Sequence, residues 1–462
     1  MLQTRLSEIR VRWQDLMDGF WFVPGLISGG IAVLALIFLG FDHLHGESDL
    51  PFLFSGNSSA ASGILSAISA SFIAALGLSF SIMIVTFQLV TSQFTPRGLR
   101  GLLSDRVTQS ISGYFVGIFA YALIVLAAVR DPAPNHPGFV PALSISLAIL
   151  LAFVGLILLI IFFHHIAGSM HIYNITARIS RETLEALDDM YPAWSNDATQ
   201  QEDGAQLLAQ WQQEGDPDLI YATHNGYVQT IDFDGLLHAF SRIGPGVRLQ
   251  LAVCPGEFVS KESVIARVWS PRNLEDAAVE VLRRCVVVLK QRDMEQDPAF
   301  GIRQLTDIAL RAMSPAVNDP STAVNCIHYL QAIFEHLAHC GPAPSVRHLG
   351  GSIVVIRYLT FQEYVQVLVE IGRVTTTNAR VARALLRALA SLIDIAAHTA
   401  QERIPYLLEI ADAIVMPALA DARTDLDRQI LNEAYQPIQE IAQKLKALPD
   451  ASSGAARKEI TH

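Results

Sequence analysis

The stretch from Leu50 to Pro96 constrains the fold most, because none of its forty-seven residues is Asp, Glu, Lys or Arg. Its second half is apolar over more than the roughly 20 residues that a helix needs to cross about 30 Å of hydrocarbon. It is also rich in small and hydroxyl residues, which let membrane helices approach one another closely. The stretch therefore predicts a spanning helix that packs against other helices and carries a polar stripe.

Four apolar segments are long enough to span a membrane, and all of them lie in the first 165 residues. They cover residues 19–41, 64–94, 107–129 and 142–163. A cleaved signal peptide is not expected at the first, because an arginine-bearing lead-in precedes it and no small-x-small cleavage site follows. The predicted fold class is an α-helical membrane domain of four transmembrane helices, followed by an α+β domain and a C-terminal helical bundle.

The basic residues of the short loops predict the orientation of these helices. Lys and Arg are absent between spans one and two, and Arg130 is alone between spans three and four, whereas the other flanks carry several arginines. Positive residues mark the cytoplasmic side of a membrane protein. Both termini, and the large region after the fourth span, are therefore expected in the cytoplasm of a bacterial cell, with the spans in the inner membrane.

The second span suggests a candidate for a permeation path. Four of its polar residues fall on one helical face at i, i+7, i+11 and i+14, namely Ser81, Gln88, Ser92 and Thr95. They could join helices within one subunit, or they could line a water-filled path in a homo-oligomer, and the sequence leaves both interpretations open. The predicted spans contain no acidic or basic residue, which argues against a proton pump but not against a passive pore.

The arginines that follow the second span also have two interpretations. Arg97, Arg100 and Arg106 would lie at the cytoplasmic mouth of such a pore, where a positive ring favours anions. The simpler explanation is that they are the positive-inside signal.

Composition limits what the remainder of the chain can bind. Residues 171–462 contain 26 Lys and Arg against 36 Asp and Glu, so nucleic-acid binding is not expected there. The four cysteines have no C-x-x-C spacing, and nothing nearby completes a metal site around His164, His165 and His171. We therefore expect neither a metal nor another cofactor.

The part after the fourth span divides by pattern into a connecting helix and linker at 171–216, an α+β domain at 217–374, a helical region at 375–448 and a disordered tail at 449–462. Alternation predicts strands at 226–232, 247–253, 285–290, 352–359 and 364–371. Asp234 is expected to cap the short helix between the first two of these strands.

The densest local signature is QDPAFGIRQLTDIALRAMSPAVNDPSTAVNCIHYL, at residues 296–330. It predicts two helices that meet at an Asn-Asp-Pro corner, with Asp319 or Ser321 capping the second helix. The corner could be purely architectural. It could also present a polar cleft, lined by Arg303, Asp307, Arg311, Asn318, Asp319 and Thr322.

These motifs resemble a known family, the bacterial predicted membrane proteins called domain of unknown function 2254. The resemblance rests on SQF-x-PR at residues 92–97, on SP-x-x-NDP-x-TA at residues 314–323 and on the segments around them. It implies an inner-membrane protein with a membrane part followed by a soluble part, and it implies no activity. Family-motif positions without an assigned role are Gln88, Ser92, Gln93, Pro96, Arg97, Arg303, Asn318, Asp319, Pro320 and Thr322.

Two function classes follow from these observations. The first is an oligomeric, channel-like protein that passes small ions along the second span and is gated by the cytoplasmic domain. The second is a membrane-anchored sensor or scaffold whose cytoplasmic domain binds a small ligand or a protein. An enzyme is not expected, because the chain has no P-loop, nucleophile elbow, G-x-G-x-x-G or H-E-x-x-H motif.

Overall fold

The computed structural model describes residues 21–45, 53–93, 105–131, 138–169, 172–191, 203–271, 274–341, 343 and 345–447. The chain divides into two compact units, residues 1–175 and 176–462, which we call the membrane unit and the soluble unit. The predicted fold class is confirmed, since four apolar helices are followed by a mixed α/β region and C-terminal helices.

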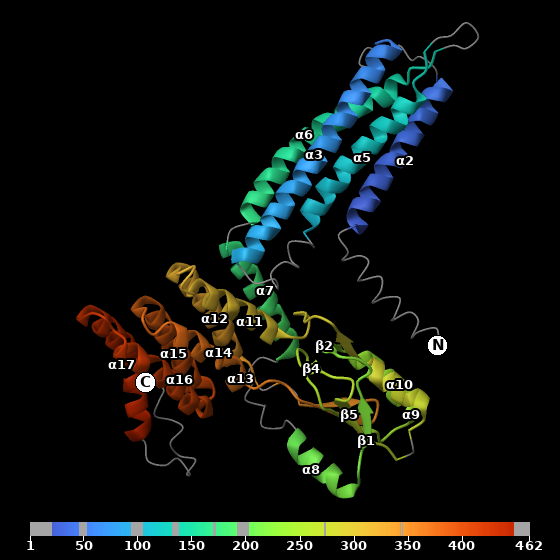
Figure 1. Ribbon diagram of the computed structural model, residues 1–462. Coiled ribbons are helices and arrows are strands. Elements are labelled where there is room, and N and C mark those ends of the chain that lie inside the picture. The colour runs from blue at the N-terminus through green and yellow to red at the C-terminus, as the bar shows by residue number, and fades with distance from the viewer. Residues whose placement is uncertain are drawn as a thin grey trace. The chain divides into compact units, whose positions relative to one another are not determined.

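The membrane unit consists of four long helices lying side by side (Figure 1). They are α2 (Phe22–His45), α3 (Ser58–Gln93), α5 (Arg106–Ala128) and α6 (Ala142–Ser169). Each contains an apolar segment of 23 to 31 residues, long enough to cross a bilayer. Each predicted span overlaps one of these helices, although α3 begins six residues earlier than the predicted span and α2 continues four residues farther.

Helix α5 is the centre of the membrane unit, with half of its apolar window buried. Two glycines one turn apart on α5 form its contact with α2. A Cβ atom on Gly113 would lie 2.6 Å from the backbone of Pro24, and one on Gly117 would lie 2.6 Å from the Ile31 side chain. This is the small-x-x-x-small arrangement that brings membrane helix backbones together.

One carboxylate joins the ends of two membrane helices. Asp42 of α2 is 8% exposed and accepts hydrogen bonds from the backbone N–H groups of Leu143 and Ser144, at 3.1 and 3.0 Å, and from the Ser144 hydroxyl at 2.5 Å. These are free donors of the first turn of α6, so Asp42 acts as its N-cap from another helix. The predicted first span ended at Phe41 and placed this carboxylate outside the helix.

The soluble unit begins within α7 (Ile172–Met190) and places its strands together at one side, away from helices α11 to α17 (Figure 1). The elements up to the last strand are α8 (Gly204–Glu214), β1 (Asp218–Tyr221), β2 (Gly226–Ile231), α9 (Phe233–Ile243), β3 (Arg248–Leu251), β4 (Phe258–Val259), β5 (Val264–Trp269), α10 (Asp276–Arg284), β6 (Val286–Leu289), α11 (Pro298–Ala312), α12 (Pro320–His339), β7 (Val346–Leu349) and β8 (Ser352–Ile356).

The strands form two sheets around one apolar core. The larger has the order β1-β5-β3-β8-β7 and is antiparallel except between β3 and β8, and the smaller is the antiparallel sheet β4-β2-β6. Leu249 and Leu251 of β3 pair with Val354 and Ile356 of β8, and all four are buried. Alternate residues of a strand share one face, so these two strands direct one apolar row into the core.

Helices complete the soluble unit. They are α13 (Phe361–Val365), α14 (Val367–Val374), α15 (Ala379–Thr399), α16 (Ile404–Ala420) and α17 (Asp425–Ala447). Helix α15 is central and packs against α12, α16 and α17. Its buried residues, among them Leu385, Leu389 and Leu392, recur at intervals of three and four, as in an amphipathic helix.

Two local predictions are wrong. Residues 364–371 are not a strand but form α13 and α14, because Thr360 and Glu363 make a capping box and Tyr364, Leu368 and Ile371 are buried at helical spacing. The N-cap of α9 is Asp232 rather than Asp234. The predicted disordered tail lies outside the described residues.

Candidate functional site

The exposed face of α3 contains a line of mostly small residues, which we call the α3 seam, beside the exposed large residues Ile73, Leu78, Ile84 and Val85. The members of the seam are Ala60, Gly63, Ala67, Ala70, Ala74, Gly77, Ser81 and Gln88. Its members follow two interleaved seven-residue series, and all are exposed. A Cβ atom on Gly63 or Gly77 would meet nothing within 4 Å. The exposed face of α6 instead carries large apolar residues such as Leu150, Phe153 and Ile160. A lipid-facing surface has no need of the small residues that the seam contains.

Two of the four pore-lining candidates are described, and both lie on the α3 seam. The Ser81 hydroxyl donates to the Gly77 carbonyl oxygen at 2.9 Å, and the Gln88 side chain is exposed. Ser92 belongs to α3, but its side chain and the whole of Thr95 lie outside the described part of the chain. The polar residues on the opposite face, Ser79 and Thr86, are buried within the unit.

Only Arg106 of the three mouth candidates is described, and it is the first residue of α5. Arg97 and Arg100 lie outside the described residues. Beside Arg106, Asp105 caps α5 by accepting from Val107 and Thr108 and also lies 2.7 Å from Nε2 of His165. Burial alone would raise the pKa of Asp105, but the hydrogen bonds from Thr108 and His165 hold it below its ordinary value.

The Asn-Asp-Pro corner connects α11 to α12 by backbone geometry. Asn318 adopts a left-handed φ of 47°, which asparagine tolerates better than most residues. Asp319 then caps α12, accepting from the N–H groups of Ser321 and Thr322 at 3.0 and 3.1 Å and from the Thr322 hydroxyl at 2.6 Å. The contacts of Asp319 and Thr322 are therefore those of a helix cap.

The remaining cleft candidates lie along α11. Arg303 donates from both terminal nitrogens to the Glu370 carboxylate of α14, at 2.6 and 2.9 Å. Asp307 contributes to the electrostatic environment of Arg303, and the Arg311 side chain is partly buried. The structure thus brings Asp319 together with Thr322, and Arg303 together with a residue of α14 that the sequence did not indicate.

We expect these two carboxylates to make the soluble unit sensitive to acid. The hydrogen bond from Arg303 lowers the pKa of Glu370, and the hydrogen bond from Thr322 lowers the pKa of Asp319. A carboxylate with a lowered folded-state pKa stabilises the fold above its unfolded value, about 4, and this stabilisation is lost as the pH falls through the folded value. The melting temperature should therefore fall between about pH 5 and pH 3.

Thermal unfolding of the detergent-solubilised chain, followed by circular dichroism, measures this pH dependence. The double variant Asp319→Asn, Glu370→Gln should have a flatter profile in that window. The matched control is Asp394→Asn, at an exposed position of α15, which should leave the slope as in the wild type. A double variant with the wild-type slope would contradict the assignment.

A buried ion pair is the strongest polar feature that sequence reasoning missed. Arg292 donates to both oxygens of Asp297, at 2.7 and 2.9 Å, and Asp297 is 2% exposed. Asp297 also caps α11 by accepting from the N–H of Phe300. Burial raises the pKa of Asp297, against the opposing charge of Arg292. Only the Asp-Pro dipeptide, typical of a helix start, could have indicated this role.

A small cavity adjoins this ion pair. Its volume is about 10 Å³, the lower limit for one water molecule, and it is lined by Met190, Cys254, Gln296, Asp297, Tyr358 and Tyr364 among others. The Tyr364 and Tyr191 hydroxyls are 3.1 Å apart. Burial raises the pKa of the Cys254 thiol to about 11, so this cysteine is a poor nucleophile. The cavity is too small for a substrate.

Helix α7 is embedded in the soluble unit along α11 and α12. Asn325 of α12 donates to the Thr176 hydroxyl at 2.9 Å, and Nε2 of His336 lies 2.9 Å from a carboxylate oxygen of Asp188. The Thr183 side chain lies over Gly301 of α11, where a Cβ atom would be 1.9 Å from the threonine Oγ1. The helix that follows the last membrane span is thus an integral part of the soluble fold.

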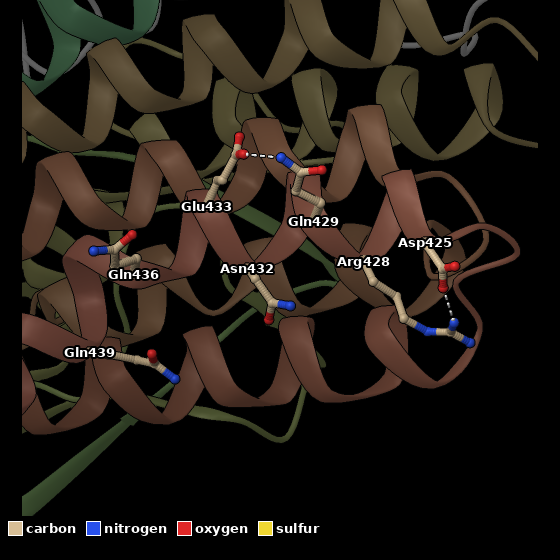
Figure 2. A pocket seen from close by; sticks show the side chains of 7 residues that line it. All are labelled: Asp425, Arg428, Gln429, Asn432, Glu433, Gln436 and Gln439. Atoms are coloured by element: carbon tan, nitrogen blue, oxygen red, sulfur yellow. Dashed lines mark hydrogen bonds and ion pairs between the residues drawn. The ribbon is translucent and has the colours of Figure 1, made fainter.

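A shallow groove runs along α17 and has a volume of about 590 Å³. Figure 2 shows its lining side chains on that helix, namely Asp425, Arg428, Gln429, Asn432, Glu433, Gln436 and Gln439. Some of them bond to one another, with Gln429 donating to Glu433 at 2.8 Å. Side chains from a single helix do not converge on a point, so the groove does not have the geometry of a ligand site.

A family comparison covers most of the chain. Residues 17–391 match the family described as Predicted membrane protein (DUF2254). The chain belongs to this family. As a DUF2254 member it is similar to uncharacterised proteins of Mycobacterium bovis and Mycobacterium tuberculosis H37Rv. Each is 31% identical over 392 residues, covering 82% of this chain and 72% of the relative. No solved structure matches the chain.

The DUF2254 match includes both motifs on which the resemblance rested, and it identifies a predicted membrane protein without an activity. The described residues contain no group of three or more His, Cys, Asp or Glu side chains that could hold a metal ion. His165 is instead in contact with Asp105. The α3 seam is the described surface with the clearest unexplained chemistry.

Proposed function

We propose that this protein is a homo-oligomeric, channel-like protein of the bacterial inner membrane, through which small ions pass passively along α3. The observation that carries the proposal is the α3 seam, a line of small, hydroxyl and amide residues that is exposed among the residues that the structure describes. Small residues at seven-residue intervals permit close contact between helices of different copies. The polar edge of the seam, at Ser81 and Gln88, would then face the shared axis.

The charge distribution favours a passive path over a pump. The α3 seam contains no ionisable residue, and the buried carboxylate of the unit, Asp42, is occupied in capping α6. A pump or proton relay needs intramembrane groups that change charge, whereas a pore can be lined by hydroxyls and amides. The positive-inside arginines support cytoplasmic termini, and α7 offers a route for gating because two residues separate it from α6.

Cysteine crosslinking tests the oligomer separately from conduction. The four native cysteines are buried, so an introduced surface cysteine can be oxidised selectively. Ser81→Cys in native membranes should form a disulfide-linked dimer of the chain. The matched control, Ile157→Cys on the exposed face of α6, should not. If the α6 cysteine crosslinked efficiently and the α3 cysteine did not, the contact between copies of the chain would not run along the α3 seam.

Planar-bilayer recording of the purified, reconstituted protein tests conduction. Gln88→Glu adds a negative ring near one end of the path and should shift the reversal potential in a salt gradient towards that of cations. His164→Glu, on the exposed face of α6 and a similar distance from its helix end, should leave the reversal potential unchanged. The channel assignment fails if the wild-type oligomer shows no conductance under any ion gradient. A membrane-anchored binding module would then be the remaining function.

A further inference from the structure

One end of the helical part of the soluble unit carries exposed valines beside arginines. Val317, in the corner between α11 and α12, is 49% exposed, and Val374, in the corner between α14 and α15, is 50% exposed. Arg373 and Arg380 flank Val374 and are also exposed. The carboxylates of Asp319 and Glu370 interact with Arg380 and Arg373, respectively. We call this end, with its two exposed valines and two exposed arginines, the corner patch.

Helices α7 and α12 run in the same direction, which fixes the end at which the α11–α12 corner lies. Thr176 of α7 contacts Asn325 of α12, and Asp188 of α7 contacts His336 of α12. From the first contact to the second, α7 advances by twelve residues and α12 by eleven. The beginning of α12, and with it Val317, therefore lies at the end where α7 begins.

Helix α15 runs in that direction as well. Ser391 donates to Glu335 of α12 at 2.5 Å, and farther along both helices Thr399 donates to the Ala338 carbonyl at 3.3 Å. At the opposite end, the charge of Arg380 acts on Asp319. The beginnings of α7, α12 and α15 thus share one end of the unit, and Val374 and Arg380 are there together with Val317.

Chain continuity limits the distance between this end and the bilayer. The apolar span of α6 ends at Gly168 and contains 27 residues, about 40 Å of helix, which is close to the full thickness of a bilayer with its headgroups. Helix α7 begins at Ile172, at most about 14 Å of extended chain beyond Gly168. Thr176 lies about one helical turn after Ile172 along α7. From its contact partner Asn325, the distance back to the start of α12 is about 9 Å of helix, in the direction of the start of α7. This length of chain allows Val317 to reach the headgroups.

We propose that the corner patch rests on an anionic phospholipid surface, with Val317 and Val374 entering the headgroup region and Arg373 and Arg380 binding lipid phosphates. Guanidinium groups bind phosphate well, and small apolar side chains beside them favour the interface over water. The inference does not depend on conduction or on the α3 seam. It needs only the connection between the last span and α7 and the register of the helices.

A fluorescent probe at Val317 tests the contact in the full-length chain. Val317→Cys, labelled with an environment-sensitive fluorophore, is reconstituted in nanodiscs of phosphatidylcholine and phosphatidylglycerol that contain a spin-labelled lipid. We expect quenching of the fluorophore at Val317. The matched control is His398→Cys, exposed at the other end of α15 and about 27 Å of helix from Arg380, where no quenching is expected.

Charge and lipid composition separate this contact from the alternatives. Each arginine near an anionic surface strengthens association about fivefold, so Arg373→Gln with Arg380→Gln should weaken docking about 30-fold and remove most of the quenching. Arg387→Gln, one heptad farther along α15, should not. Pure phosphatidylcholine should act like the double variant. The proposal is overturned if the fluorophore at Val317 is not quenched. It is also overturned if neither the double arginine variant nor pure phosphatidylcholine reduces the quenching. A blue-shifted but unquenched probe overturns it in favour of a second copy of the chain.

Discussion

Asp297→Ala is expected to destabilise the soluble unit by about 3–5 kcal/mol, the usual cost of removing one partner from a buried ion pair. Two effects add at this position. Arg292 keeps a largely buried charge without its carboxylate, and α11 loses the cap on the N–H of Phe300. The expected loss is a large fraction of the stability of an ordinary domain.

Denaturant unfolding measures this loss in the detergent-solubilised chain, because Trp211 and Trp269 are buried in the soluble unit and report on its unfolding. The matched control is Glu370→Ala, which breaks the more exposed pair with Arg303 and should cost about 1 kcal/mol or less. The double variant Arg292→Ala, Asp297→Ala should recover part of the loss. If Asp297→Ala cost no more than Glu370→Ala, the pair would not stabilise the fold as described.

Gly301→Ala is expected to separate α7 from α11 and to destabilise the unit by about 1–3 kcal/mol or more, as overpacking of a close contact does. The Cβ atom would lie 1.9 Å from the Thr183 hydroxyl oxygen and 3.0 Å from the Met294 sulfur. Both helices would have to move apart, because the Thr183 hydroxyl is bonded to the Ile179 carbonyl of its own helix.

A second-site change makes this prediction specific. Thr183→Ala removes the atom nearest to the new side chain, so it should restore part of the stability lost in Gly301→Ala, measured by the same tryptophan signal. Gly168→Ala is the neutral control, because a Cβ atom there meets nothing within 4 Å. Equal losses with and without Thr183→Ala would show that the contact between α7 and α11 does not limit the substitution at Gly301.

Helices with a strong pattern of their own could be predicted, whereas elements defined by distant contacts could not. The four spans follow from long apolar runs, and the start of α12 follows from the Asn-Asp-Pro motif that contains Asp319. Helix α14 was predicted as a strand because its β-branched residues favour strands locally. The capping box at Thr360 and burial in the helical layer override that preference.

For the candidate site residues, the sequence indicated only that they share a helical face or belong to a motif, and not which residues they contact. The spacing of Ser81 and Gln88 indicates that they share a helical face, but not whether that face is covered by α5 or α6. Arg303 belongs to a motif, whereas its partner Glu370 is 67 residues away and has no local signal. Arg292 and Asp297 are close in sequence, yet their burial depends on the turn at Gly256 that lies over them.

The sequence by itself determined which segments enter a membrane, where the strongest helix caps lie and to which family the chain belongs, because hydropathy, turn chemistry and motifs are properties of neighbouring residues. The tertiary structure alone decided which face of α3 remains exposed, which carboxylate is buried against Arg292 and how α7, α12 and α15 align. These properties depend on contacts between residues far apart in the chain, and the pattern around either partner does not specify the other.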